Sequence, residues 1–133
     1  MNNQKTNWSE LFKIRLGNPS ESADFHDIVK ILCVRKIIRK SKRKSWLRVY
    51  TEWNLNNGSH LKPDICVEHL KEKSIVCYEL QKEFDAFYVR DRTEKYSKVN
   101  IPYFNTVDLI IIPLKSLSHN LDELNKELDE YIV

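Results

Sequence analysis

The sequence predicts an α/β fold, and three observations along the chain support this prediction. Residues 20–40 carry apolar side chains at helical spacing, which predicts a helix with one buried stripe. Three β-type runs follow in close succession, separated by short polar segments of hairpin length. A second helical stretch then leads to a continuous apolar run, residues 107–112, which is typical of a buried central strand. With a final helix, these elements predict the order αβββαβα and a mixed central sheet flanked by helices.

Capping and turn residues set the expected boundaries of these elements. Ser20 or Ser22 can cap the first helix, and Ser116 or Ser118 can open the last one. Residues 1–19 are expected to form an N-terminal arm, followed by a single domain over residues 20–133. We expect the strands at residues 46–55, 64–69, 74–81 and 107–112, and the two later helices at about residues 87–99 and 116–131.

The bulk composition is that of a small globular protein. The chain has 133 residues, 41% hydrophobic and 31% charged, so one domain can form a core without metal or disulfide staples. It has no apolar run near 18 residues and no basic-then-apolar N-terminus, which predicts no membrane contact and a cytoplasmic or otherwise intracellular location. Cys33, Cys66 and Cys77 lie in apolar runs without CxxC spacing, so we expect reduced core residues.

The net charge of +3 conceals a strong asymmetry. Eight of the 22 basic residues fall between positions 35 and 48, a window that contains no acid. Such a local field attracts phosphate backbones and makes binding fall steeply with salt. The alternative is a solvated helix end, because cations near a helix C-terminus complement its dipole.

Two acidic residues stand at the ends of neighbouring β-type runs. Asp64 follows Pro63, and Glu79 is followed by Leu80 and Gln81. Side chains alternate along a strand, so Glu79 and Gln81 point the same way. Antiparallel pairing of the two runs would bring Asp64 beside Glu79, and the resulting group could hold a divalent cation. Each acid taken alone is also compatible with a turn residue or a solvated strand end.

A Pro-Asp at the start of one strand, with Glu-x-Gln on the next, resembles the PD-(D/E)XK nuclease superfamily, especially its small Holliday-junction-resolvase-like and competence-type members. The resemblance implies a restriction-endonuclease-like αβββαβα core, with Asp64 and Glu79 binding Mg²⁺ or Mn²⁺. Gln81 then stands where the family usually has lysine, which removes an expected cation. An extra acid is common in the family, and Glu52 or Glu21 would supply it here.

The resemblance implies a metal-dependent endonuclease that hydrolyses phosphodiester bonds in DNA, or alternatively RNA. A chain of this length has little room for a separate target-recognition domain, which favours structure-specific or weakly sequence-specific cleavage. The protein could act as a homodimer. Because Gln81 replaces the usual lysine, an inactive nucleic-acid-binding protein that keeps the nuclease fold is an alternative. A third alternative is a structural or interaction protein whose basic segment contacts an acidic partner. The size would suit a virus or mobile element. The residues expected to contact nucleic acid are Lys40, Lys42, Arg43, Lys44, Lys82, Arg90 and Arg92.

Two further residues leave alternatives open. His26 lies beside the apolar stripe of the first helix, where it could cap, face solvent or approach the acidic site. Tyr96 on the later helix could anchor the core or stack on a base.

Overall fold

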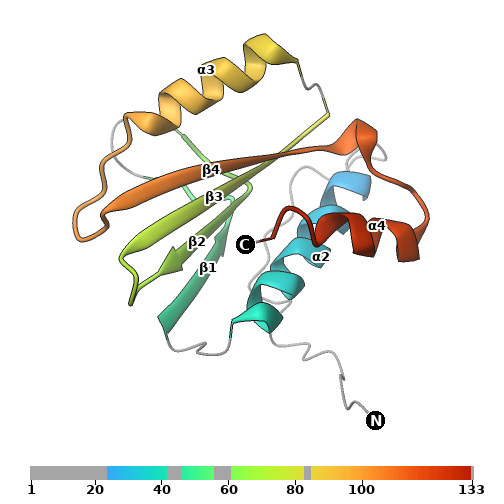
Figure 1. Ribbon diagram of the computed structural model, residues 1–133, viewed down its shortest axis with the longest axis horizontal. Helices are drawn as coiled ribbons and strands as arrows, with labels where there is room; N and C mark the ends of the chain where they lie inside the picture. The colour runs from blue at the N-terminus through green and yellow to red at the C-terminus, as the bar shows by residue number, and fades with distance from the viewer. Residues whose placement is uncertain (1–23, 42–45, 56–60, 83–84, 133) are drawn as a thin grey trace.

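A computed structural model describes residues 24–41, 46–55, 61–82 and 85–132 of the chain. Four strands form one sheet in the order in which they occur along the chain (Figure 1). The first three pair antiparallel, and the fourth runs parallel to the third, so the expected mixed sheet is confirmed. The expected arm and the capping residues Ser20 and Ser22 lie outside the described residues. The strands are β1 (Leu47–Thr51), β2 (Ile65–His69), β3 (Ser74–Gln81) and β4 (Thr106–Pro113).

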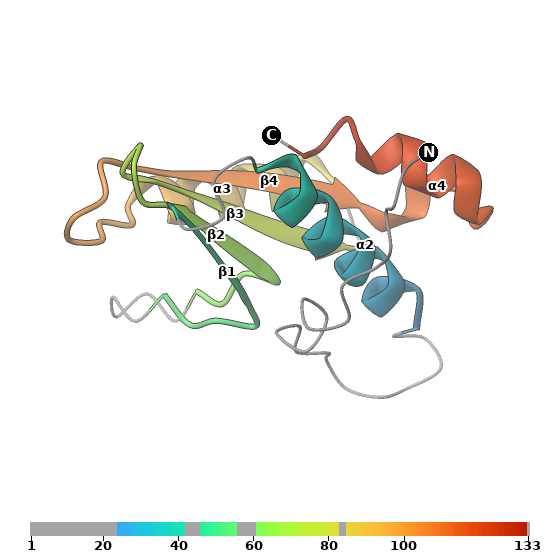
Figure 2. The same cartoon turned by 90° about the horizontal axis from the view of Figure 1, so that it is seen from below.

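Helices cover both faces of the sheet. Helices α2 (Asp24–Lys40) and α4 (Leu121–Leu128) lie on one face, and α3 (Ala86–Ser97) lies on the other (Figures 1 and 2). Helix α3 links β3 to β4, because parallel neighbours need a crossover connection. A short 3-10 helix, η3 (Leu114–Ser116), leads from β4 towards α4. In the described part of the chain, no helix combines the length and apolarity needed to cross a bilayer.

The core divides into two clusters, one on each side of the sheet. The larger cluster packs α2 and α4 against the sheet and contains Val34, Tyr78 and Leu128. The smaller one surrounds Tyr96 under α3, and this side chain is only 1% exposed. Tyr96 therefore anchors the core and cannot stack on a base from this position. Cys33, Cys66 and Cys77 are buried and free, which confirms the prediction of reduced core cysteines.

Two predicted boundaries are wrong. The first strand was expected to continue to residue 55, but β1 ends at Thr51. Glu52 has φ of 51°, in the left-handed region, and a residue there cannot extend a strand. The last helix starts later than expected, because Asn120 and not a serine caps it by accepting the Glu123 N–H.

The position of β4 in the sheet also differs from the prediction. The apolar run over residues 107–112 was expected to form a central strand, whereas β4 lies at an edge of the described sheet and pairs with β3 alone. Its residues from 109 to 112 are apolar because α3 covers one face of the sheet and α2 and α4 cover the other, whereas Thr106 and Asp108 at its start are exposed. Burial on both faces produces a continuous apolar run whether or not the strand has a second neighbour.

Candidate active site at one end of the sheet

Three acidic residues from successive strands meet at one end of the sheet. In the β2–β3 ladder Ile65 pairs with Tyr78, so the same register places Asp64 opposite Glu79 just beyond the last pair. On the other side of β2, the Glu52 N–H donates to the Asp64 carbonyl oxygen at 3.1 Å. Antiparallel pairing, which the sequence predicts, thus brings Asp64 beside Glu79, with Glu52 next to it.

Asp64 is held in a defined orientation by donors on both of its oxygens. Its Oδ2 accepts the backbone N–H of Leu80 at 2.7 Å, and its Oδ1 lies 3.3 Å from Nε2 of His26. Burial acts to raise the pKa of Asp64, but the hydrogen bonds from His26 and Leu80 outweigh it and hold the pKa below its ordinary 3.8. The side chain of Glu52 also acts to lower the pKa of Asp64. At neutral pH Asp64 is therefore an ionised and positioned acceptor.

Helix α2 contributes two basic side chains to these acids. His26 and Lys30 are four residues apart, so they lie on the same face of the helix one turn from each other. The Lys30 side chain is fully buried, and its Nζ lies 3.1 Å from Oε2 of Glu52. The left-handed backbone of Glu52 costs about 1–2 kcal/mol, which indicates that packing and this ion pair hold it in place.

Sequence reasoning missed Lys30 and left the place of His26 open. A signal was present, because Val29, Cys33 and Val34 surround Lys30 at helical spacing and predict that its position is buried. A buried lysine requires a charged or hydrogen-bonding partner, so its position alone indicates a nearby acid. The sequence does not say which acid, because the pairing of β1 with β2 decides where Glu52 lies.

The third acid, Glu79, is bound by side chains of helix α3. Glu79 is 2% exposed, and its carboxylate accepts four hydrogen bonds, all from α3. Arg92 donates from Nε to Oε1 at 3.0 Å and from Nη2 to Oε2, while the hydroxyls of Tyr88 and Tyr96 donate at 2.8 and 2.6 Å. The hydrogen bond to Glu79 raises the pKa of Arg92 above its usual range. Glu79 therefore anchors α3 to β3, and Arg92, which was expected to bind nucleic acid, is its main partner.

The remaining predicted residues are spread over several places. Gln81 ends β3 and is half-buried, while Lys82 and Arg90 are exposed. Lys40 lies at the far end of α2, where its Nζ donates to the Ile132 carbonyl oxygen at 2.9 Å. Glu21, Lys42, Arg43 and Lys44 lie outside the described residues.

The acids differ in how well they fit a divalent cation. Within residues 24–41, 46–55, 61–82 and 85–132, no group of three or more His, Cys, Asp or Glu side chains is arranged to hold a metal ion. Asp64 and Glu52 nevertheless lie side by side, because the Glu52 N–H donates to the Asp64 carbonyl oxygen, and Lys30 balances the charge of Glu52. Both are hard oxygen ligands of the kind that Mg²⁺ and Mn²⁺ prefer. Glu79 does not fit in this arrangement, because donors from α3 already occupy both of its oxygens.

Comparison with known proteins adds no relative to this picture: no protein-family model, no curated protein and no solved structure matches the chain. The interpretation of the site therefore depends on its own geometry. That geometry is the arrangement of the three acids around His26 and Lys30.

The His26–Asp64 contact predicts a pH-dependent contribution to stability. The hydrogen bond to Asp64 raises the pKa of His26 above 6.5, so the stabilisation is complete below pH 6.5 and is lost as the pH rises through the folded value. The lowered pKa of Asp64 preserves the pair down to about pH 4. We expect His26→Gln to reduce the free energy of unfolding by roughly 1–2 kcal/mol at pH 5.5, and by much less at pH 9. Urea unfolding at both pH values measures this difference.

The matched control is the same substitution in an Asp64→Asn background. There, His26→Gln should have a smaller and less pH-dependent effect, because Asp27, 3.7 Å from Nδ1 of His26, is then the acid that remains beside the imidazole. An equal loss of stability at pH 5.5 and pH 9 in the wild-type background would show that the contact does not depend on charge.

Proposed function

We propose that this protein is a metal-dependent nuclease that hydrolyses phosphodiester bonds in DNA with weak sequence specificity or structure specificity. The observation that carries the proposal is the convergence of Asp64, Glu52 and Glu79 at one end of the sheet, where the Glu52 N–H donates to the Asp64 carbonyl oxygen and the β2–β3 register places Asp64 opposite Glu79. Two acids held together beside two basic side chains can bind a cation and a phosphate at the same place. The motif order that resembles the PD-(D/E)XK superfamily agrees with this placement.

Asp64 and Glu52 are the residues that would hold Mg²⁺ or Mn²⁺ in this proposal. A bound ion would neutralise phosphate charge and lower the pKa of a coordinated water. Asp64 is suited to bind it because the Leu80 N–H and His26 keep its carboxylate oriented and ionised. Glu79 could join the ligands only by leaving Arg92 and the two tyrosines.

Lys30 and His26 supply the positive charge that Gln81 cannot. Lys30 holds the Glu52 carboxylate in place and adds a buried ammonium group to the site. Protonated His26 adds a second positive charge beside Asp64, because the hydrogen bond to Asp64 raises the pKa of His26 above its ordinary 6.5. Gln81 can only orient a water or a phosphate oxygen through hydrogen bonds.

A second candidate is a nucleic-acid-binding protein that does not cleave. The saturated carboxylate of Glu79 favours it, since one of the two expected metal ligands serves to hold α3. In this case Asp64 acts as a strand-end acceptor for the Leu80 N–H, and the excess basic charge binds the backbone without turnover.

The test is cleavage of labelled duplex, single-stranded and branched DNA, and of RNA, with Mg²⁺, Mn²⁺ or EDTA. We expect metal-dependent cleavage by the wild type and at least a 100-fold loss with Asp64→Asn. Asp108→Asn is the matched control, because Asp108 is an exposed acid on β4 and its loss should leave the rate unchanged. Binding without cleavage under every condition would favour the second candidate.

A further inference from the structure

Two stacked aromatic side chains lie next to the acidic site. Trp53 follows Glu52 directly, and its ring stacks on that of Tyr50 in β1, with 4.7 Å between the ring centroids and 25° between the ring planes. Tyr50 covers one face of the indole, yet Trp53 remains 43% exposed. The exposed part of the ring therefore includes the face turned away from Tyr50, where a second flat ring can stack.

The path of the chain around Glu52 places Trp53 beside the acids. The Glu52 N–H donates to the Asp64 carbonyl oxygen at 3.1 Å, and the Leu55 N–H donates to the Leu61 carbonyl oxygen at 3.1 Å. Between these two hydrogen bonds, Trp53 runs beside the segment that leads into Asp64. Successive Cα atoms are about 3.8 Å apart, so the backbone of Trp53 is that close to Glu52.

The two rings lie at the edge of the sheet that is farther from helix α3. Tyr50 pairs with Cys66 and packs against the core cluster on the α3 side of the sheet. Strands β1 and β4 form the two edges of the described sheet, and α3 runs alongside β4 (Figure 1). The α3 side of β1 is therefore less covered than that of β4, which explains why Trp53 stays exposed.

A cation accompanies the rings. Lys62 is exposed and precedes Asp64 by two residues, in the segment that runs beside Trp53. Its ammonium group can bind a phosphate oxygen, while the flat indole can stack on a nucleic-acid base. Together with the acids, these residues match the parts of one nucleotide: a base, a phosphate and the phosphodiester bond next to it.

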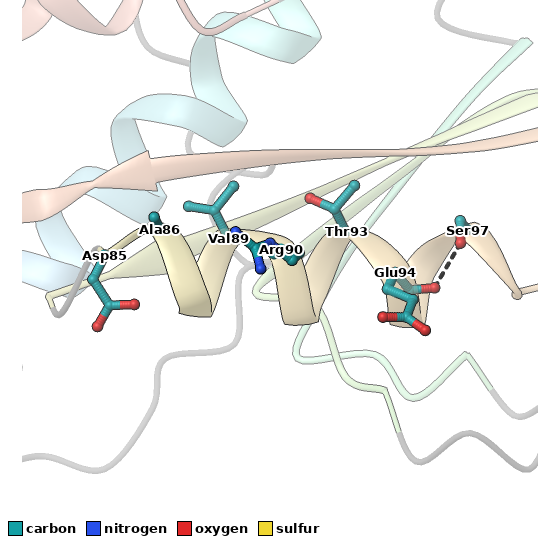
Figure 3. Close-up of a pocket in the computed structure, with 7 residues that line it drawn as sticks. All are labelled: Asp85, Ala86, Val89, Arg90, Thr93, Glu94 and Ser97. Carbon is teal, nitrogen blue, oxygen red and sulfur yellow. Dashed lines mark hydrogen bonds between the residues drawn. The ribbon is translucent and has the colours of Figure 1, made fainter.

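The pocket on the outer face of α3 lacks this combination. Its volume is about 690 Å³, and none of the described residues that line it is aromatic (Figure 3). The lining combines Arg90 with two acids, Asp85 and Glu94. A pocket with more acid than base repels a phosphate backbone, so the surface around Trp53 is the better match for nucleic acid.

We propose that Trp53, supported by Tyr50, stacks on an unpaired base of DNA and directs the acidic site to single-stranded or unpaired segments. The inference rests on the proposed function and names its substrate class. Bases inside a duplex are stacked on their neighbours, whereas an unpaired base can be splayed out onto an aromatic ring. Every base has a flat face, so stacking tolerates any sequence and agrees with weak sequence specificity.

The test is fluorescence anisotropy in EDTA with three labelled probes of about 12 nucleotides per strand: oligothymidylate, an abasic strand and a duplex. Trp53→Leu should lower affinity for oligothymidylate about tenfold, since stacking on one aromatic side chain contributes about 5- to 150-fold per base. Affinity for the abasic strand and the duplex should change little, because backbone contacts remain. Trp53→Phe keeps an aromatic face and should retain most of the affinity.

A second measurement uses the wild type and does not depend on the folding of any variant. Oligothymidylate should quench the tryptophan fluorescence of the protein, whereas the abasic strand should not, because only a base can stack on the indole. Equal quenching by the two strands, or no quenching by either, would contradict stacking.

Trp46→Leu is the matched control, because Trp46 is 46% exposed and lies just before β1, at the end of the strand opposite Trp53. It should leave binding of all three probes unchanged. An equal loss in Trp46→Leu, an equal loss of abasic binding in Trp53→Leu, or no binding of oligothymidylate by the wild type would overturn the proposal.

Binding in EDTA separates this inference from the nuclease proposal. A loss confined to oligothymidylate in Trp53→Leu supports base stacking even if the protein cleaves no DNA. Metal-dependent cleavage by the wild type, together with undiminished oligothymidylate binding by Trp53→Leu, would refute stacking and leave the nuclease proposal intact.

Discussion

Replacing Glu79 with alanine is expected to lower the free energy of unfolding by about 3–5 kcal/mol. The substitution removes the acceptor of four hydrogen bonds from α3 and leaves the Arg92 guanidinium, 23% exposed, without its carboxylate. The hydroxyls of Tyr88 and Tyr96 lose their acceptor as well, and a buried donor without a partner costs further free energy. Urea unfolding followed by circular dichroism at pH 7 measures the loss.

Two comparisons make the Glu79 result specific. Glu94→Gln on the same helix removes an exposed ion pair with Lys98 and should change stability by less than about 0.5 kcal/mol. In a double-mutant cycle, Glu79→Ala and Arg92→Met should cost less together than the sum of the single changes. A wild-type urea midpoint in Glu79→Ala would show that the network does not hold α3, and Glu79 would then be available as a metal ligand.

This result bears directly on the nuclease proposal. An inactive Glu79→Ala variant is expected whether Glu79 binds a metal or only anchors α3, because the fold is weakened in either case. Activity lost through Asp64→Asn in a folded protein is the more decisive observation. Stability should therefore be measured before the activity of any Glu79 variant is interpreted.

Replacing Lys30 with methionine is expected to cost about 2–4 kcal/mol and to reduce cleavage at least 100-fold. Methionine matches the shape of the buried lysine stem, so the change removes charge and leaves packing nearly intact. Without the ammonium group, Glu52 loses its 3.1 Å partner and repels the nearby Asp64 carboxylate. Urea unfolding and initial cleavage rates measure the two effects.

The control for Lys30→Met is a double variant that combines it with Glu52→Gln. Removing both charges should recover part of the lost stability, because no uncompensated carboxylate remains beside Asp64. Cleavage should stay low in the double variant, since neither the cation nor the acid is restored. Full activity of Lys30→Met would show that Lys30 only supports the fold of the site.

Local patterns predicted most of the elements correctly because each depends on short-range chemistry. The apolar runs that begin at Pro63–Asp64 and at residue 74, and the helical spacing from residue 20 onward, correspond to β2, β3 and α2. Boundaries were harder to predict. Glu52 ends β1 through a left-handed backbone, and Asn120 competes with two serines as the cap of α4.

The sequence by itself determined the α/β class, the burial of the cysteines, and the antiparallel β2–β3 pairing that places Asp64 beside Glu79. These follow from side-chain periodicity and turn length, which act within a few residues. Only the tertiary structure shows that β4 lies at an edge of the described sheet and that Arg92 of α3 binds Glu79. The same holds for α2, which places His26 beside Asp64 and Lys30 beside Glu52. The physical reason is that a buried charge must find an opposite charge in space, and packing of distant segments chooses that partner.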